Sequence, residues 1–167
     1  MLAARLYGID DIRVEEAAKP RIAADEVLVK VKVSAICGTD IRMLTSGAAG
    51  VDEAHPLIPG HEIAGDIDEV GDLVKGYKKG MRVAVAPNMG CGVCDRCIEG
   101  NGHLCADYRA LGVNTDGGFA EYVRIPAQAV RGGNLAVLPE HVSYTAGALN
   151  EPLSCVYNGA VLCDPTG

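Results

Sequence analysis

The sequence feature that most constrains the fold is a cluster of four cysteines with the spacing C-x2-C-x2-C-x7-C, at Cys91, Cys94, Cys97 and Cys105. Two residues between cysteines let a tight turn direct both thiolates at one ion, and four thiolates complete the tetrahedral shell of zinc. Because protein atoms occupy every position, such a zinc would stabilise a loop and leave no place for a substrate. The cluster therefore predicts a structural zinc lobe at about residues 88–108, and any chemistry must lie elsewhere.

The other cysteines and the N-terminus bear on the redox environment. The chain has 7 cysteines, an odd number, and its N-terminal segment lacks the charged region and apolar run of a secretory signal. We therefore expect a cytoplasmic protein whose reduced thiols bind metal, rather than a protein with a disulfide framework. Cys155 and Cys163 lie in apolar stretches without a partner at ligand spacing, so we expect them to pack as small buried hydrophobic residues.

Composition limits the class of protein. In 167 residues, 49% are hydrophobic, and Gly reaches 21 while there is one Phe and no Trp. This composition favours one domain of many short strands and turns, spanning 1–167. A formal net charge of −7 without basic runs argues against nucleic acid as a partner. No apolar stretch approaches the length of a membrane span.

Apolar runs with period-two or continuous character predict strands over most of the chain. The predicted strands are Leu2 to Tyr7, Ile12 to Ala17, Val27 to Ile36, Ile63 to Val70, Met81 to Ala86, Gly118 to Ile125 and Gln128 to Pro139. A helix is predicted at 152–161, because Pro152 suits the first helical position and Leu153, Val156, Tyr157 and Ala160 share one face. The sequence thus predicts a mainly β fold with short helices.

A second candidate metal site combines residues that are distant in sequence. Cys37 ends the strand Val27 to Ile36 beside Gly38, which permits a sharp turn, and His61 with Glu62 follows later. A thiolate, an imidazole and a carboxylate are typical of catalytic zinc, where an open position lets the ion polarise an alcohol. The residues alone leave a simpler interpretation open, in which Cys37 only packs and His61 and Glu62 form a satisfied pair.

Five motifs together resemble the zinc-dependent medium-chain alcohol dehydrogenases, in the family order. They are Cys37-Gly-Thr-Asp, Gly60-His-Glu with Ala64-Gly65, the four-cysteine lobe, Asp116-Gly-Gly-Phe-Ala-Glu-Tyr-Val123 and Glu151-Pro-Leu. The resemblance covers nearly the whole chain. It implies the N-terminal catalytic domain, called GroES-like, which is a twisted and partly closed β-barrel with a zinc lobe.

The resemblance also implies roles for individual residues. Cys37, His61 and Glu151 would be ligands of a catalytic zinc that the carboxylate of Glu62 can approach. Thr39 would receive the substrate proton, and Asp40 would orient His61. Cys91, Cys94, Cys97 and Cys105 would hold the structural zinc, giving two zinc ions per chain. Glu151 in place of a second cysteine is similar to the polyol and threonine dehydrogenase branch, which indicates a secondary alcohol or polyol substrate.

Relatives also carry a Rossmann domain for NAD or NADP, and we find no G-x-G-x-x-G that follows a strand and opens a helix. We therefore expect the Rossmann domain to be absent from this chain, the fragment to be inactive alone, and the apolar face at Leu153 to favour a homo-oligomer or marginal stability. Two alternatives remain, which are a non-enzymatic zinc-binding module and a thiol redox sensor built on the cysteine lobe.

Overall fold

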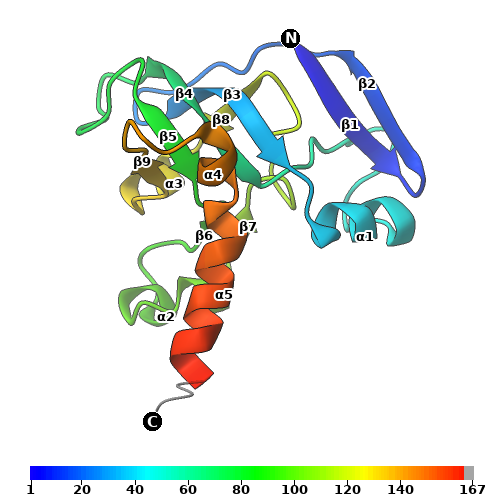
Figure 1. The fold of residues 1–167 in the computed structure, drawn as a ribbon. Helices are drawn as coiled ribbons and strands as arrows, with labels where there is room; N and C mark the ends of the chain where they lie inside the picture. Colours follow the sequence, from blue (N-terminus) through cyan, green and yellow to red (C-terminus); the bar gives the residue numbers. More distant parts are fainter. Residues whose placement is uncertain (164–167) are drawn as a thin grey trace.

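Five antiparallel strands form the central sheet, in the order β8-β3-β4-β5-β9 (Figure 1). The computed structural model describes residues 1–163. The strands are β3 (Val27–Ala35), β4 (Glu62–Val70), β5 (Arg82–Val85), β8 (Tyr122–Ile125) and β9 (Leu135–Val137). Their apolar, β-branched runs favour extended backbone that is buried on the sheet. The predicted mainly β fold is therefore confirmed.

A separate hairpin partly closes this sheet. It consists of β1 (Leu2–Gly8) and β2 (Asp11–Glu16), and Asp10 adopts a positive φ of 55° in the turn between them. Isolated bridges join Ala3 to Ala120 and Leu6 to Leu57, so the hairpin is attached to the loops that lead into the sheet. This arrangement is a partial barrel rather than a flat layer.

The apolar side chains form two clusters. The larger lies on the sheet and includes Val27, Val29, Ile63, Ile67, Val83 and Ile125. The smaller consists of Leu6, Met43 and Leu57 and joins the hairpin to α1 (Gly38–Ser46). Both clusters lie beside the segments that carry Cys37 and His61, which fixes those segments in place.

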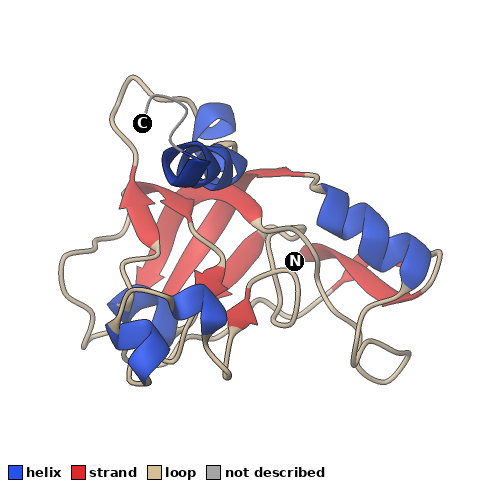
Figure 2. Ribbon diagram, turned by 90° about the horizontal axis from the view of Figure 1, so that it is seen from below, coloured by secondary structure: helices blue, strands red, loops and turns tan. Residues whose placement is uncertain are grey.

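Short helices and a small second ladder surround the sheet (Figure 2). They are α2 (Asp95–Ile98), the 3-10 helix η1 (Gly102–Leu104), α3 (Ala127–Arg131) and α4 (Tyr144–Ala148), with β6 (Asn88–Met89) paired to β7 (Arg109–Ala110). The longest helix, α5 (Asn150–Cys163), projects away from the sheet (Figure 1). None of the helices within 1–163 has the length and apolar character of a membrane span.

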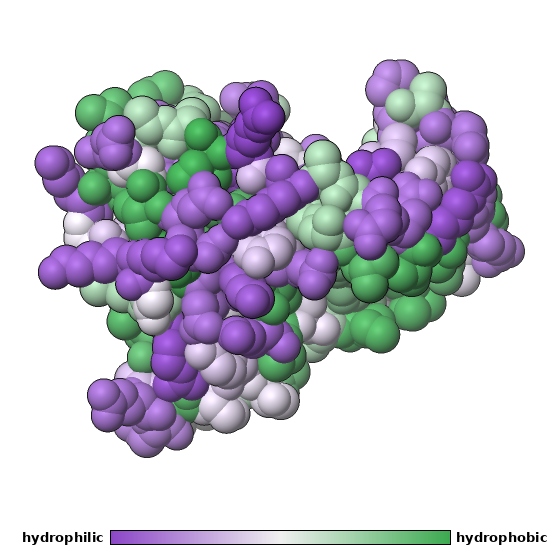
Figure 3. Space-filling model, turned by 90° about the horizontal axis from the view of Figure 1, so that it is seen from above, coloured by the Kyte–Doolittle hydropathy of each residue, from purple (hydrophilic) through white to green (hydrophobic). Residues whose placement is uncertain are grey.

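Hydrophobic residues remain exposed on the hairpin side of the molecule. Ile9, Ile12 and Val14 are among the exposed large hydrophobic residues, and Val14 is 74% exposed. Figure 3 shows a hydrophobic area at the right, on the side where Figure 1 places β1, β2 and α1. A second set, Leu153, Val156 and Tyr157, is exposed on α5.

Several predictions about individual elements were wrong. The segment Gln128 to Pro139 is not one strand, because Ala127–Arg131 forms α3 and only Leu135–Val137 forms a strand, β9. The good helix formers Ala127, Gln128 and Ala129 outweigh the apolar pattern until Gly132 and Gly133 end the helix. The expected strand from Gly118 shortens to β8, since only Tyr122–Ile125 pairs with β3.

The C-terminal predictions also need adjustment. The helix predicted at 152–161 begins at Asn150 and reaches Cys163, so it is longer at both ends. Cys155 and Cys163 are exposed and not buried, because α5 projects from the sheet. The last four residues of the predicted domain, 164–167, lie outside the described part of the chain. Within 1–163 every strand ladder is antiparallel, so this range holds no parallel Rossmann sheet.

Candidate metal centres

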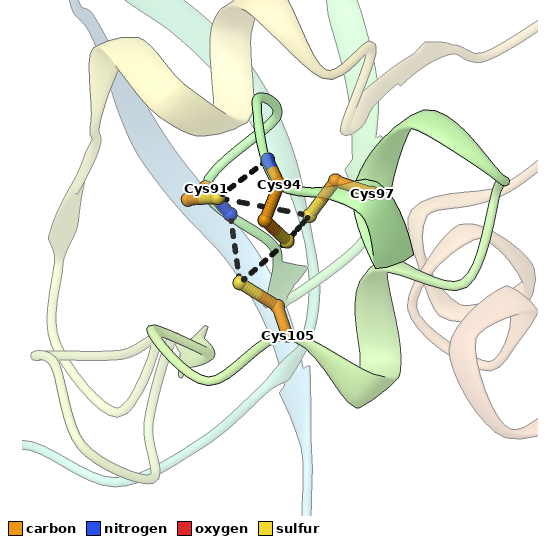
Figure 4. Close-up of side chains that lie close together, drawn as sticks. All are labelled: Cys91, Cys94, Cys97 and Cys105. Carbon is orange, nitrogen blue, oxygen red and sulfur yellow. Dashed lines mark hydrogen bonds between the residues drawn. The ribbon is translucent and has the colours of Figure 1, made fainter.

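The four lobe cysteines converge on one point (Figure 4). Cys91 and Cys94 come from a loop after β6, Cys97 from α2, and Cys105 from the residue after η1. Their sulfurs are separated by 3.5 Å (Cys94 to Cys97), 3.8 Å (Cys94 to Cys105) and 4.0 Å (Cys91 to Cys97). Tetrahedral zinc with Zn–S bonds of about 2.3 Å holds its thiolates about 3.8 Å apart. The arrangement therefore fits one zinc ion.

The electrostatics of the lobe also favour a cation. Hydrogen bonds from the backbone amides of Val93 and Cys94 lower the pKa of Cys91 to about 6. The amide of Gly92 favours the thiolate of Cys97, yet burial and the neighbouring thiols raise the pKa of Cys97 to about 12. The surroundings therefore favour the thiolate of Cys91 and disfavour a second negative charge at Cys97, and a divalent ion among the sulfurs would relieve that repulsion.

The lobe is fixed to the rest of the protein at Gly90. A Cβ atom added to Gly90 would lie 2.6 Å from the Sγ of Cys97, so only glycine fits. The side-chain amide of Gln128 in α3 donates to the carbonyl oxygen of Gly90. These contacts position the loop that carries Cys91 against the sheet.

The structure brings Cys37, His61 and Glu62 together as a second cluster. One ligand atom from each lies within 4.8 Å of the others. Cys37 is half-buried at the N-cap of α1, while His61 and Glu62 are buried where β4 begins. Gly38 is the first residue of α1 and has no positive φ, so the chain passes from β3 into α1 without using the conformational freedom that glycine permits there.

The carboxylate of Asp40 connects the two segments of this cluster. Its Oδ2 accepts a hydrogen bond from the backbone amide of Cys37 at 2.8 Å, and its Oδ1 accepts one from the amide of Gly60 at 3.2 Å. Asp40 is 7% exposed, so both bonds are shielded from water. The carboxylate thus sets the position of Cys37 relative to the residue before His61.

The imidazole of His61 is buried and has one unpaired nitrogen. Its Nδ1 lies 3.7 Å from Oδ1 of Asp40, which is too long for a hydrogen bond, and it has no partner among the described residues. The resemblance implies that Asp40 orients His61 directly. In this structure Asp40 lies close to His61 but forms no hydrogen bond with it. An unpaired polar atom at this depth is costly unless it binds something.

The remaining predicted site residues are not among the three side chains that converge. Thr39 is the second residue of α1 and follows Cys37 by two positions. Glu151 is in the first turn of α5 and is not among the side chains whose ligand atoms converge with Cys37. Instead, its Oε1 accepts from the Sγ of Cys155 at 3.7 Å.

Tyr108 is a further polar residue near the lobe that was not predicted from the sequence. Its hydroxyl donates to Oδ1 of Asn88 at 2.5 Å, and burial, with smaller contributions from the charges of Glu151 and Cys155, raises its pKa. No pattern in the sequence marks Tyr108, because its position depends on the pairing of β6 with β7.

Comparison with known proteins gives one consistent family. The family model described as "Alcohol dehydrogenase GroES-like domain" matches residues 23–132. The chain is 40% identical to sorbitol dehydrogenase of Bacillus subtilis over 157 residues, covering 92% of this chain and 43% of that protein. It is 44% identical to D-altritol 5-dehydrogenase of Agrobacterium fabrum over 132 residues, covering 79% of this chain and 37% of that protein.

The fold is similar to a solved structure as well. An alcohol dehydrogenase from Escherichia coli CFT073, complexed with NADH, superimposes with a TM-score of 0.88 at 34% identity. The match covers 99% of this chain and 46% of that one. The chain therefore spans less than half the length of these relatives, and its similarity is confined to one part of each.

Proposed function

Because the chain belongs to the alcohol dehydrogenase family defined by the GroES-like domain, we propose that it is the catalytic domain of a zinc- and NAD(P)-dependent dehydrogenase. The substrate would be a small polyol or other secondary alcohol, which is oxidised to a ketone. The observation that carries this proposal is the convergence of Cys37, His61 and Glu62 within 4.8 Å of one another. The proposed domain covers 1–167, with the zinc lobe at about 88–108.

A zinc ion suits this donor set. A thiolate, an imidazole and a carboxylate are the ligand types of catalytic zinc, and the buried Nδ1 of His61, which has no hydrogen-bond partner within 1–163, supports His61 as a ligand. We propose Glu151, in the first turn of α5, as a further ligand, since α5 contacts β4, the strand that begins at Glu62. With the lobe, the chain would bind two zinc ions.

A zinc ion held by Cys37, His61 and Glu62 would supply a Lewis acid for the alcohol oxygen, and a nicotinamide cofactor would supply the hydride acceptor. We assign the hydroxyl of Thr39 the role of receiving the substrate proton while its own proton passes to solvent, because Thr39 is the second residue of α1, two positions after Cys37. Asp40 accepts hydrogen bonds from the backbone amides of Cys37 and Gly60, and it thereby fixes the segments that carry Cys37 and His61. Glu62 adds a buried carboxylate beside His61. Thr39 would therefore contact the alcohol, while Asp40 would position the segments that carry Cys37 and His61.

Hydride transfer also needs a cofactor site. Within 1–163 the structure has only antiparallel ladders, so we propose that the chain alone does not turn over. The exposed apolar residues Leu153 and Val156 support the further proposal that the isolated chain self-associates, which size-exclusion chromatography would reveal as an apparent mass above 17.4 kDa.

A chimera tests the proposed function. This chain would replace the matching N-terminal part of the Bacillus subtilis sorbitol dehydrogenase, whose remaining part would follow it. We expect the chimera to reduce NAD or NADP with polyols, and we expect Cys37→Ala in the same chimera to abolish that activity. Cys163→Ala is the matched control, because Cys163 is exposed at the end of α5.

The zinc content decides how a negative result is interpreted. A chimera that carries two zinc ions and binds the cofactor but oxidises no polyol or secondary alcohol would contradict the proposal. Activity that survives Cys37→Ala would contradict the assigned centre.

A further inference from the structure

A tyrosine and an asparagine form a polar pair beside the candidate catalytic centre. Because β6 pairs with β7 in the register of Asn88 with Ala110, Tyr108 lies diagonally across the ladder from Asn88. The hydroxyl of Tyr108 donates to Oδ1 of Asn88. Met89 is buried, so Asn88, its neighbour in the strand, directs its side chain to the opposite, exposed face. The pair therefore lies on an accessible surface.

The strand register brings the segment that follows β5 toward the segment that contains His61. Val85 at the end of β5 lies opposite Ile63 on β4, and the two strands are antiparallel. The chain after Val85 therefore runs past the residues that precede Ile63. A hydrogen bond from the amide of Leu111 to the carbonyl of Pro87, at 3.2 Å, keeps the segments of Tyr108 and Asn88 together there.

The start of α5 is also near Tyr108. Burial raises the pKa of Tyr108, and so do the charges of Glu151 and Cys155, which lie one helical turn apart. Partial desolvation raises the pKa of Cys155, with smaller contributions from Glu151 and from the charge of Cys37. These charges act over short range, so the start of α5 lies near Tyr108, and Cys155 lies in turn near Cys37.

The pair offers what a second substrate hydroxyl needs. After donating to Asn88, the hydroxyl oxygen of Tyr108 can still accept, and Nδ2 of Asn88 donates to no residue within 1–163. A substrate hydroxyl both donates and accepts, so it can donate to the oxygen of Tyr108 and accept from Nδ2 of Asn88 at the same time. We propose that Tyr108, held by Asn88, is a specificity-determining residue that binds an additional hydroxyl group of a polyol, on the substrate chain beyond the carbon that is oxidised.

This inference rests on the proposed function, because it needs an alcohol at the Cys37 centre. Nuclear magnetic resonance titration of the zinc-loaded chain tests it, with sorbitol as the polyol and 2-butanol as the alcohol with one hydroxyl. We expect Tyr108→Phe to weaken sorbitol binding about fivefold, the factor typical of one lost hydrogen bond, and to leave 2-butanol unchanged. Tyr157→Phe is the matched control, because Tyr157 is 68% exposed on α5.

The outcomes separate the two proposals. If sorbitol and 2-butanol both bind near Cys37, and Tyr108→Phe weakens both equally or neither, the proposed role of Tyr108 is overturned. The proposed function would then remain intact. If neither alcohol shifts the signals of Cys37 and His61 in the wild-type chain with two zinc ions, both proposals fail. An unchanged zinc content in Tyr108→Phe verifies that the fold and the metal sites are preserved.

Discussion

Asp40 accepts a hydrogen bond from the backbone amide of Gly60 at 3.2 Å, across 20 residues of sequence. The same carboxylate also accepts from the amide of Cys37. One buried side chain therefore joins the segment of the candidate thiolate ligand to the segment of the candidate imidazole ligand. The geometry of the centre depends on this connection more than on any direct contact between the ligands.

Replacing Asp40 tests this connection. Asp40→Ala leaves two amides without their acceptor, and an unpaired buried donor costs about 1–3 kcal/mol, so we expect a loss of about 2–4 kcal/mol of unfolding free energy. Asp40→Asn keeps one acceptor oxygen and should cost less. Urea unfolding measures both variants, and an Ala variant as stable as the wild type would contradict the structural role.

Gly60 itself is constrained by conformation and by space. Its φ is +90°, and an added Cβ would lie 2.5 Å from the ring of Phe119. We expect Gly60→Ala to destabilise the protein by about 3 kcal/mol, the sum of left-handed backbone strain and overpacking. Gly76→Ala is the matched control, because Gly76 has φ +84° and open space around it. It should cost only about 1–2 kcal/mol in urea unfolding. Equal losses for the two variants would rule out the contact with Phe119.

The lobe should lose zinc when its packing is disturbed. We expect Gly90→Ala to displace Cys97 and to weaken zinc binding by the lobe roughly tenfold, as measured by competition with a chelator. Gly102→Ala should have little effect, since its nearest neighbour would be 3.9 Å from the new Cβ. Unchanged zinc affinity in Gly90→Ala would contradict the predicted contact.

Removing zinc with a chelator should expose the lobe to proteases. Only short elements, α2 and η1, lie between Cys91 and Cys105, so the sulfurs replace a core there. We expect cleavage within 88–108 to appear first and the sheet to stay protected. Equal protection with and without metal would show that the lobe is stable by itself.

The ion pair between Lys19 and Asp68 should make the stability of the protein depend on pH. A hydrogen bond from Lys19, together with its charge, lowers the pKa of Asp68 below its ordinary value. The pair therefore contributes stability above the unfolded-state pKa of Asp68, and this contribution is lost as the pH falls through the lower folded-state pKa. We expect Lys19→Met to lower the urea midpoint at pH 7 more than at pH 2. Lys75→Met is the control, because Lys75 has no ion pair within 1–163. An effect of Lys19→Met that does not change with pH would contradict the pairing.

The sequence was most informative where one chemical requirement dominates. Thiol spacing alone predicted that Cys91 and Cys105 converge, and continuous apolar runs located β3 and β4 to within about two residues. The prediction failed at α3, where helix propensity in Ala127–Arg131 competes with a weak apolar pattern. It also could not find Tyr108, whose partner Asn88 is 20 residues away and is determined by strand pairing.

The placement of Glu151 shows a second limit. Its proposed role comes from family resemblance, and within the described chain its carboxylate contacts Cys155 and does not join the Cys37 cluster. A helix that projects from the sheet has few contacts to fix its angle, so packing alone does not determine how closely Glu151 approaches Cys37.

Zinc content tests the central claim most directly. Elemental analysis of the purified chain should give two zinc ions per molecule for the wild type, one for Cys37→Ala and two for the control Cys163→Ala. A Cys37→Ala chain that retains both ions, or a wild-type chain that binds only one, would contradict a metal centre at Cys37, His61 and Glu62.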